Sequence, residues 1–196
     1  MNDHKGFFAM MVRMKYIERW ALMRNSVSEN ICEHSLEVAM LAHGLGIIGR
    51  KRFGKDLSPE RLAMLGMYHD CTEIITGDMP TPVKYANDEL KEAYKAIEDS
   101  AAHRLLEMLP EDLRAEYESY FLPEQITPEE YRYVKAADKL SALIKCIEEE
   151  KTGNQEFRSA KQATYESLQQ MNMPEVTVFC EVFLPEYYKT LDELEH

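Results

Sequence analysis

Apolar residues recur every three to four positions along nearly the whole chain, which is the spacing of one face of an α-helix. A convincing alternation of apolar and polar residues, which would indicate a half-buried strand, is not found in the sequence. No repeat, low-complexity tract or linker divides the chain. The sequence therefore predicts a single all-α domain, a helical bundle that spans residues 1–196. The expected helices cover residues 7–20, 31–48, 61–75, 90–108, 131–147 and 176–191.

The clearest helix start is Ser58-Pro59-Glu60, which combines a capping serine, a proline at the first helical position and an early acid. Three more prolines stand near the starts of later helices, namely Pro110, Pro128 and Pro174. Two longer segments, 21–29 and 77–87, lack the helical spacing. We expect them to be irregular and to flank the polar residues that carry the chemistry.

The chain has 23 basic and 35 acidic side chains, which gives a formal charge of −12. A surface with this balance repels a long phosphate backbone, so a long nucleic acid is not an expected partner. One small anionic ligand is still compatible with the charge, because a metal ion and a single arginine can reverse the potential locally.

Apolar runs such as residues 7–12 are far too short to span a bilayer, which takes about 20 residues, so no membrane partner is expected. They also lack the cleavage site of a signal peptide. The four cysteines lie far apart and form no CxxC pair; they are Cys32, Cys71, Cys146 and Cys180. This usage is typical of reduced thiols in a cytoplasmic protein.

The stretch MYHDCTEIITGDMPTP, residues 67–82, gathers polar residues behind an apolar lead-in. In a helix, His69 and Glu73 stand at i and i+4 and Asp70 and Glu73 at i and i+3, so all three could project into one pocket. Taken alone, Glu73 could be a solvated helical residue. The two prolines that follow Gly77 could likewise do no more than end the helix.

Two further polar residues stand on apolar helix faces. His34 lies on the stripe of Ile31 and Val38, and Asp138 lies within VKAADKLSALI. A carboxylate in such surroundings is costly without a cation or hydrogen-bond donors. His34 alone could be a satisfied core histidine, and Asp138 alone could pair with a neighbouring lysine. Together with His69-Asp70, the set suits a borderline divalent metal with positions left for water.

The order of these residues resembles the HD-domain metal-dependent phosphohydrolases, whose pattern is His…His-Asp…Asp on a helical core. The resemblance is closest to the bacterial HD-type 5′-deoxynucleotidases and extends from residue 7 to about residue 191. It is carried by IERWALMRN, ENICEHSLEVAMLAHGLG, AMLGMYHDCTEIITGDMPTPVKY and VKAADKLSALIKCIEE. The combination of ERW, EHS, YHDCTE and GDMPTPVKY is more specific for this subfamily than the HD pattern alone.

The resemblance implies an HD-type helical bundle that hydrolyses deoxyribonucleoside 5′-monophosphates to nucleoside and phosphate, as a homodimer. It implies one divalent ion, such as cobalt, manganese or zinc, held by His34, His69, Asp70 and Asp138. Glu73 matches the family's catalytic acid, and Asp78 is a second candidate for the proton transfer. The residues expected to bind substrate are Arg19, Trp20, Asp70, Asp78 and Thr81.

The residue types make chemical sense in these roles. Arg19, expected one residue before the end of a helix, could form two parallel hydrogen bonds to phosphoryl oxygens. Trp20 could pack against the deoxyribose and leave no room for a 2′-hydroxyl, although a lone tryptophan is more often a core anchor. Glu73 could move a proton to the departing 5′-oxygen or from the attacking water.

Two other functions are compatible with parts of this pattern. A different HD reaction, on a cyclic dinucleotide, a triphosphate or an alarmone, would keep the metal ligands but need a larger and more basic pocket. A metal-stabilised helical interaction protein without activity would leave Arg19, Glu73 and the proline-containing loop unexplained.

Overall fold

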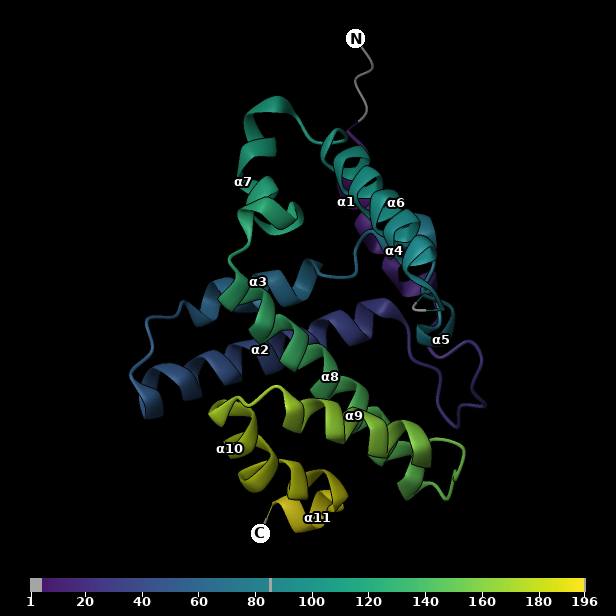
Figure 1. Ribbon diagram of the computed structural model, residues 1–196, viewed down its shortest axis with the longest axis vertical. Coiled ribbons are helices and arrows are strands. Elements are labelled where there is room, and N and C mark those ends of the chain that lie inside the picture. The colour runs from purple at the N-terminus through teal and green to yellow at the C-terminus, as the bar shows by residue number, and fades with distance from the viewer. Residues whose placement is uncertain (1–4, 85, 196) are drawn as a thin grey trace.

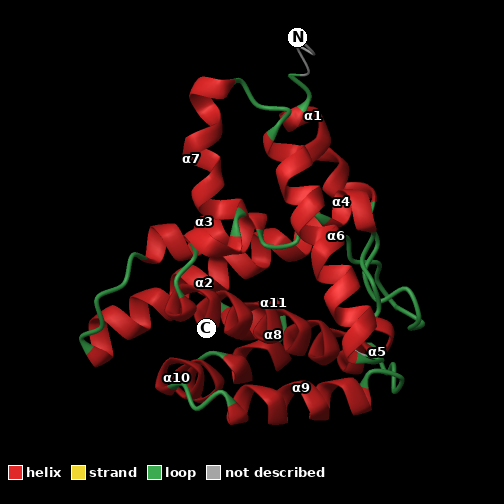
Figure 2. Ribbon diagram, turned by 45° about the horizontal axis from the view of Figure 1, so that its top comes forward, coloured by secondary structure: helices red, strands yellow, loops and turns green. Residues whose placement is uncertain are grey.

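The computed structural model describes residues 5–84 and 86–195; Tyr85, the last residue of the GDMPTPVKY stretch, lies outside the described residues. The elements are α1 (Phe7–Met11), η1 (Val12–Tyr16), α2 (Ile31–Phe53), α3 (Pro59–Tyr68), α4 (Glu73–Thr76), α5 (Thr81–Lys84), α6 (Asp88–Leu106), α7 (Glu111–Phe121), η2 (Pro123–Gln125), α8 (Pro128–Lys151), α9 (Arg158–Gln170), α10 (Pro174–Val182), η3 (Leu184–Tyr188) and α11 (Leu191–Leu194). Helices joined by loops make up the described chain (Figure 2). The described residues form no β-strand, and their β-type pairing is limited to one isolated antiparallel bridge between Glu18 and Asn30. The all-α fold class is thereby confirmed.

Helices α2, α3 and α8 cross in the middle of the molecule, with α1, α6 and α7 on one side of them and α9, α10 and α11 on the other (Figure 1). One apolar cluster joins α2, α8 and α10 and includes Val38, Leu140 and Phe179. A second cluster joins α1, α6 and α7 and includes Phe7 and Phe121. The core therefore has two parts, and α2 and α3 reach from one part to the other.

The polar residues singled out in the sequence lie where these two clusters meet. Asp70 directly precedes Cys71 of the second cluster, and Asp138 directly follows Ala137 of the first. His34 is buried in the first turn of α2. The junction therefore collects the imidazoles and carboxylates that a continuous apolar core would exclude.

Capping fixes where the long helices begin. The Asn30 side chain accepts hydrogen bonds from the backbone N–H groups of Cys32 and Glu33, and the Glu33 side chain accepts one from Asn30 in return. This capping box starts α2 at Ile31 and so places His34 in its first turn. Ser58 caps α3 with proline at its first position, which confirms the start expected from the sequence.

Glycine allows α2 and α3 to approach closely. A Cβ atom on Gly66 would lie 3.0 Å from Cα and 3.1 Å from the backbone nitrogen of Ala39. Any larger side chain at this position would push the two backbones apart. The close approach carries His34 of α2 and His69, which follows α3, toward each other.

Two of the expected helices are interrupted at the site. The helix expected over 7–20 ends at Tyr16, because Ile17 is extended and Arg19 donates its backbone N–H to the Glu29 carbonyl at 2.8 Å. Trp20 has a φ of 59°, so the expectation that Arg19 and Trp20 close a helix is wrong. The helix expected over 61–75 ends at Tyr68, and a turn over 69–72 separates it from α4.

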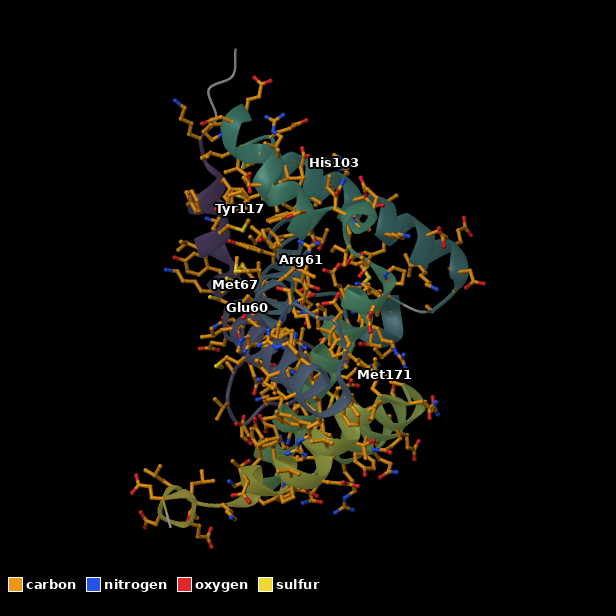
Figure 3. All side chains as sticks on the ribbon, turned by 90° about the vertical axis from the view of Figure 1, so that its left-hand side faces the viewer. Glu60, Arg61, Met67, His103, Tyr117 and Met171 are labelled. Carbon is orange, nitrogen blue, oxygen red and sulfur yellow. The ribbon has the colours of Figure 1, made fainter. Side chains whose placement is uncertain are left out.

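The C-terminal helix expected over 176–191 is also divided, into α10, η3 and α11. Helix α9 was not predicted, because few strongly apolar residues mark its buried face. Within the segment expected to be irregular, residues 77–80, 86 and 87 lie outside helices as expected, whereas residues 81–84 form the single turn α5. Arg61 connects three elements near the middle of the molecule (Figure 3): it bonds Glu130 of α8 at 2.5 Å and the carbonyls of Ser119 and Gln125.

Helix α2 is long and apolar enough to cross a membrane by length and composition alone. More than half of its most apolar window is buried inside the protein, and it carries His34 on its buried side. Its apolar character is accounted for by the core that it forms.

The loop that follows η1 is held on α8 by the buried carboxylate of Glu149. This carboxylate accepts hydrogen bonds from the Ser26 backbone N–H at 2.8 Å, from Asn154 Nδ2 at 2.8 Å and from Lys145 Nζ at 2.6 Å. Lys145 also donates to the Val27 carbonyl at 2.6 Å. Burial disfavours the charge on Glu149, but these donors outweigh it and lower its pKa to about 2.

Replacement of Glu149 by Gln should reduce stability in a pH-dependent way. The folded-state pKa lies below the unfolded value of 4.5, so the carboxylate stabilises the fold above about pH 4.5 and this contribution is lost as the pH falls toward about 2. We expect Glu149→Gln to lose about 3–5 kcal/mol at pH 7, because Lys145 then stays buried without its partner. Denaturant unfolding of both proteins from pH 7 down to pH 2.5 measures the difference.

The exposed neighbour Glu148, changed to Gln, is the matched control and should show little change at any pH. A difference between Glu149→Gln and the unmodified protein that stays constant down to pH 2.5 would contradict this account.

Candidate functional site

The orientation of His34 is fixed by a chain of hydrogen bonds. Its Nδ1 lies 3.0 Å from the Ser141 hydroxyl oxygen on α8, and that hydroxyl donates to Glu37 Oε2 at 2.5 Å. Because the hydroxyl proton goes to Glu37, the serine oxygen is free to accept the Nδ1 proton of His34. The free lone pair of the imidazole is then on Nε2, as in histidines that bind metals.

His69 follows α3 and is oriented by the helix itself. Its Nδ1 donates to the Gly66 carbonyl at 2.7 Å, which again leaves the lone pair on Nε2. The two imidazole centroids lie 5.2 Å apart. The turn over 69–72 changes the direction of the chain, so that the carboxylate of Asp70 also reaches the histidines.

Two carboxylates approach the free histidine nitrogens. Asp70 Oδ2 lies 3.4 Å from His34 Nε2 and 3.0 Å from His69 Nε2, and Asp138 Oδ1 lies 3.3 and 4.0 Å from the same two atoms. The other oxygen of Asp138 lies 3.3 Å from Lys135 Nζ. The structure therefore brings together the four residues expected as metal ligands.

This donor set fits a divalent cation. Nε2 of His34 and Nε2 of His69 are both buried and have no hydrogen-bond partner among the described residues. Buried polar atoms without a partner are rare, and a metal ion is one of the groups that satisfies them. Ligand atoms of His34, His69 and Asp70 lie within 4.8 Å of one another, and Asp138 faces the same point. Nitrogen and oxygen donors in this number suit zinc, manganese or cobalt.

Each charged group at this point changes the pKa of its neighbours. Burial and the Arg19 guanidinium disfavour protonation of His34, but Asp138 and Asp70 outweigh them and raise its pKa. Burial likewise opposes the charge on Asp70, yet the two histidines hold its pKa well below the usual range. A proton and a cation compete for the same Nε2 atoms, so metal affinity at this site falls as the pH is lowered.

Glu73 opens α4 beside these ligands and is 7% exposed. Its Oε2 is buried without a hydrogen-bond partner among the described residues. Burial, then the charges of Asp70 and Asp78, raise its pKa well above the usual range, so that it holds a proton at neutral pH. Burial also raises the pKa of Asp78, although its carboxylate accepts a hydrogen bond from the Trp20 backbone. The structure thus places both candidates for proton transfer near the cluster.

Arg19 and Trp20 reach the site from the extended segment that follows η1. Arg19 Nη1 lies 3.6 Å from Asp70 Oδ2, and its Nε lies 3.5 Å from Glu29 Oε2. The Trp20 indole donates to the same Glu29 oxygen at 2.7 Å and packs on Phe157, with ring centroids 5.2 Å apart. Both side chains therefore reach the neighbourhood of the cluster from a loop and not, as expected, from a helix end.

Thr81 is the one expected site residue that the structure does not bring in. It is exposed at the start of α5, and no hydrogen bond joins its side chain to the described residues of the cluster. Three contributors were not predicted, namely Glu29, Glu37 and Ser141. Ser141 follows Asp138 by three residues and Glu37 follows His34 by three, so a polar residue one turn from an expected ligand was the available signal.

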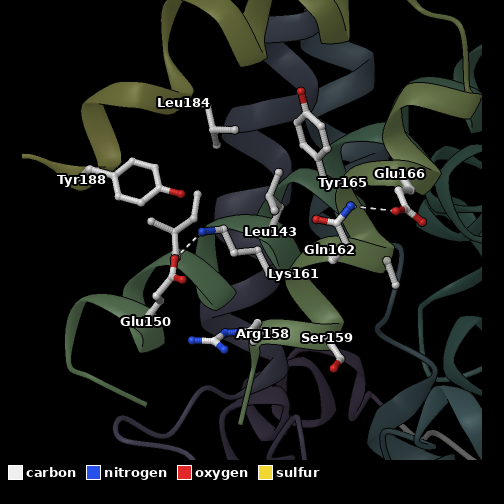
Figure 4. A pocket seen from close by; sticks show the side chains of 12 residues that line it. Leu143, Glu150, Arg158, Ser159, Lys161, Gln162, Tyr165, Glu166, Leu184 and Tyr188 are labelled. Carbon is white, nitrogen blue, oxygen red and sulfur yellow. Dashed lines mark hydrogen bonds and ion pairs between the residues drawn. The ribbon is translucent and has the colours of Figure 1, made fainter. Parts of the chain in front are cut away.

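A surface cavity of about 720 Å³ lies away from this cluster, between α8, α9 and η3 (Figure 4). Leu143 and Leu184 are among its apolar lining residues, while Lys161 bonds Glu150 and lies over the ring of Tyr188. Lys161 and Glu150 are thus paired with each other, and none of the expected site residues lines the cavity.

Comparison with known sequences gives a consistent family. Residues 6–187 match the family described as 5′-deoxynucleotidase YfbR-like. The chain is 47% identical to a 5′-deoxynucleotidase of Vibrio cholerae, over 96% of this chain and 97% of that protein. It is 48% identical to a 5′-deoxynucleotidase of Erwinia tasmaniensis, over 97% of this chain and 96% of that protein.

Comparison with solved structures gives the fold. An HD-domain phosphohydrolase from Listeria innocua superposes with a TM-score of 0.80 and 22% identity, over 96% of this chain and 91% of the other. An HD phosphohydrolase of cyanophage S-2L, solved with dA and one catalytic Zn²⁺, gives 0.64 and 23%, over 93% and 96%. The helical bundle is therefore of the HD-domain type, as the sequence resemblance implied.

Loss of His34 should abolish stoichiometric metal binding. We expect His34→Ala, dialysed against zinc and then freed of excess, to hold much less zinc than the unmodified protein, because one nitrogen ligand is removed. His43→Ala is the matched control: it lies on the same helix, is exposed, and should leave the zinc content unchanged. Elemental analysis against protein concentration measures both, and equal zinc in the two variants would rule out His34 as a ligand.

Proposed function

The chain belongs to the YfbR-like 5′-deoxynucleotidase family, and we propose that the cluster of His34, His69, Asp70 and Asp138 is the centre of its activity. The protein is a metal-dependent phosphomonoesterase that hydrolyses deoxyribonucleoside 5′-monophosphates to deoxynucleoside and phosphate. The observation that carries the assignment of the site is the pair of buried Nε2 atoms, unpartnered among the described residues, that face two carboxylates.

One divalent ion is proposed as the cofactor, with zinc, manganese and cobalt as candidates. The one catalytic Zn²⁺ in the cyanophage HD phosphohydrolase supports this number and this type of ion. His34, His69, Asp70 and Asp138 would hold it. When bound, such an ion polarises a phosphoryl oxygen and lowers the pKa of a water molecule.

Arg19 is proposed to bind the phosphate of the substrate. Its Nη1 lies 3.6 Å from Asp70, so the guanidinium is already beside the cluster, and its planar fork suits two parallel bonds to phosphoryl oxygens. Glu29 and Asp70 favour the charged form of Arg19 although burial opposes it. In a chain of net charge −12, this guanidinium is one of few cations near the expected ligands.

Glu73 is proposed as the general acid. A carboxyl group whose pKa is raised by burial and by neighbouring carboxylates keeps its proton at neutral pH and can give it to the departing 5′-oxygen. Asp78 is the alternative proton carrier, because burial raises its pKa as well. The hydrogen bond between Asp78 and the Trp20 backbone also supports a role for Asp78 in holding the 78–81 loop beside Trp20.

Trp20, Asp78 and Thr81 are proposed to form the sugar side of the site. Trp20 presents an indole held by Glu29 and Phe157, and a rigid ring can exclude a 2′-hydroxyl by steric contact. Thr81 is exposed in this structure, and its hydroxyl is proposed to contact the sugar when substrate is bound. The binding of dA by the cyanophage protein supports a deoxynucleoside as the sugar-bearing part.

We also propose a cytoplasmic homodimer that binds neither long nucleic acids nor membranes. Four free cysteines, two of them buried, support a reducing compartment. The negative net charge supports the exclusion of long nucleic acids. The homodimer is taken from the resemblance, and light scattering of the purified protein tests it.

Deoxyribonucleoside monophosphates should be the preferred substrates of the metal-loaded protein. The assay compares phosphate release from deoxyadenosine and adenosine monophosphates, a deoxynucleoside triphosphate and a cyclic dinucleotide at equal concentrations. We expect the deoxyribonucleoside monophosphate to have the highest kcat/KM. Faster hydrolysis of the triphosphate or the cyclic dinucleotide would contradict the proposed substrate class.

Two variants separate phosphate binding from sugar recognition in the same assay. Arg19→Ala should weaken both monophosphates alike, because a charge-assisted bond to the shared phosphate contributes about 1.5–3 kcal/mol. Trp20→Ala should narrow the deoxy-over-ribo ratio, because the steric contact with the 2′-hydroxyl is removed. A folded, metal-loaded Trp20→Ala protein that keeps the full ratio would place the discrimination elsewhere, with the 78–81 loop as the next segment to test.

Replacement of Glu73 should affect turnover and leave metal binding intact. We expect Glu73→Gln to retain zinc and KM but to lose about 10²–10⁴-fold in kcat, the usual contribution of a general acid. The pH profile of kcat/KM should also lose the limb that reports loss of the Glu73 proton at high pH. If kcat of Glu73→Gln stays within a few-fold of the unmodified enzyme, Glu73 is not the general acid and Asp78 becomes the candidate for the proton transfer.

A further inference from the structure

We propose that Glu29 is a positioning residue that fixes the side chains of Arg19 and Trp20 relative to each other, so that they bind the phosphate and the sugar of one substrate molecule together. The inference rests on the proposed function, because it assumes that these two side chains contact substrate. It adds a residue to which neither the sequence pattern nor the family resemblance gives a role.

The contacts of Glu29 involve three parts of the site. Its Oε2 accepts the Trp20 indole N–H at 2.7 Å and lies 3.5 Å from Arg19 Nε. Its Oε1 lies 3.9 Å from His34 Nδ1. The Glu29 side chain is 12% exposed, and so is that of Arg19. One carboxylate therefore contacts Arg19, which is proposed to bind phosphate, and Trp20, which is proposed to contact the sugar. It also lies close to the proposed metal ligand His34.

The backbone of Glu29 holds the same pair. The Arg19 N–H donates to the Glu29 carbonyl at 2.8 Å, and the adjacent residues Glu18 and Asn30 form the antiparallel bridge. Between these two points the chain makes a closed loop, 20–28, whose far end is held by Glu149. The backbone of Glu29 thus closes the loop and fixes its own position relative to Arg19.

Trp20 needs such a constraint because of its backbone. Its φ of 59° lies in the left-handed region, which a bulky side chain adopts only where the surroundings impose it. The indole bond to Glu29 and the packing on Phe157 are the side-chain contacts that hold the residue there. Without the carboxylate, the indole would lose its only hydrogen-bond acceptor among the described residues.

The two functions of the carboxylate can be separated by substitution. Glutamine at position 29 keeps an oxygen that accepts the indole N–H but removes the charge beside Arg19. Alanine removes both. If Glu29 acts by positioning, Glu29→Gln should retain sugar discrimination and lose phosphate affinity, whereas Glu29→Ala should lose both.

The first readout is kinetic, with deoxyadenosine and adenosine monophosphates and the zinc-loaded protein. We expect the deoxy-over-ribo ratio of kcat/KM to fall about 10-fold or more in Glu29→Ala and to stay within about 3-fold of the unmodified value in Glu29→Gln. KM should rise for both substrates in both variants. A Glu29→Ala ratio equal to that of the unmodified enzyme overturns the proposal, as does a Glu29→Gln ratio that falls as far as that of Glu29→Ala.

The second readout needs no activity. Trp20 is the only tryptophan of the chain, so intrinsic fluorescence reports on this indole alone. We expect Glu29→Ala to make the emission more accessible to acrylamide and Glu29→Gln to leave it unchanged. Unchanged quenching in Glu29→Ala overturns the contact on which the proposal depends, whether or not the enzyme hydrolyses nucleotides.

Glu156→Ala is the matched control, because exposed Glu156 bonds the Arg24 backbone N–H of the same loop at 3.0 Å without touching Arg19 or Trp20. Glu156→Ala should change neither the deoxy-over-ribo ratio of kcat/KM nor the acrylamide quenching of Trp20. An effect as large as that of Glu29→Ala would mean that Glu29 acts only by stabilising the loop, which overturns the proposal. If Glu29→Ala does not fold, Glu29→Asp, which withdraws the carboxylate by one methylene, replaces it with the same expected results. An unmodified protein that hydrolyses neither monophosphate contradicts the proposed function, and the quenching experiment still decides the role of Glu29.

Discussion

The contact between the α3 backbone at Gly66 and the α2 backbone at Ala39 determines where the site can form. It sets the separation of the two helices that lead to His34 and His69. The Gly66 carbonyl also accepts the Nδ1 proton of His69, so the same residue fixes the orientation of that imidazole. A side chain at this position would move α3 away from α2 and separate the two Nε2 atoms. The geometry of the site therefore depends on the absence of a Cβ atom outside it.

The site lies at the junction of two apolar clusters, where polar groups carry a desolvation cost. Asp70, Asp138, Asp78 and Glu29 face mainly Arg19 and Lys135, so carboxylates outnumber fixed cations near the histidines. A phosphate would be repelled by this arrangement unless a divalent cation offset the negative charge. The local excess of carboxylates therefore explains why phosphate binding at this site would depend on a metal ion.

The fold class could be predicted from the sequence, and the sequence also singled out the four residues that the structure gathers at the junction, because both follow local rules. Helical spacing, the cap at Ser58 and the proline at Pro128 indicate the long helices, and a histidine or an aspartate on an apolar helix face is conspicuous. The breaks at Ile17 and at 69–72 could not be predicted, because they depend on contacts between distant segments such as the bond from Arg19 to the Glu29 carbonyl. The role of Ser141 was missed for the same reason: its meaning depends on Glu37, which lies 104 residues away in the chain.

The central claim is that one cation is held jointly by two histidines and two aspartates from three separate segments. Anomalous diffraction at the zinc edge, from crystals grown with zinc, tests it most directly. The account predicts one peak at about 2.0–2.2 Å from Nε2 of His34, Nε2 of His69 and one oxygen each of Asp70 and Asp138. A peak at another place, or a peak that leaves Asp138 bound only to Lys135, would contradict it.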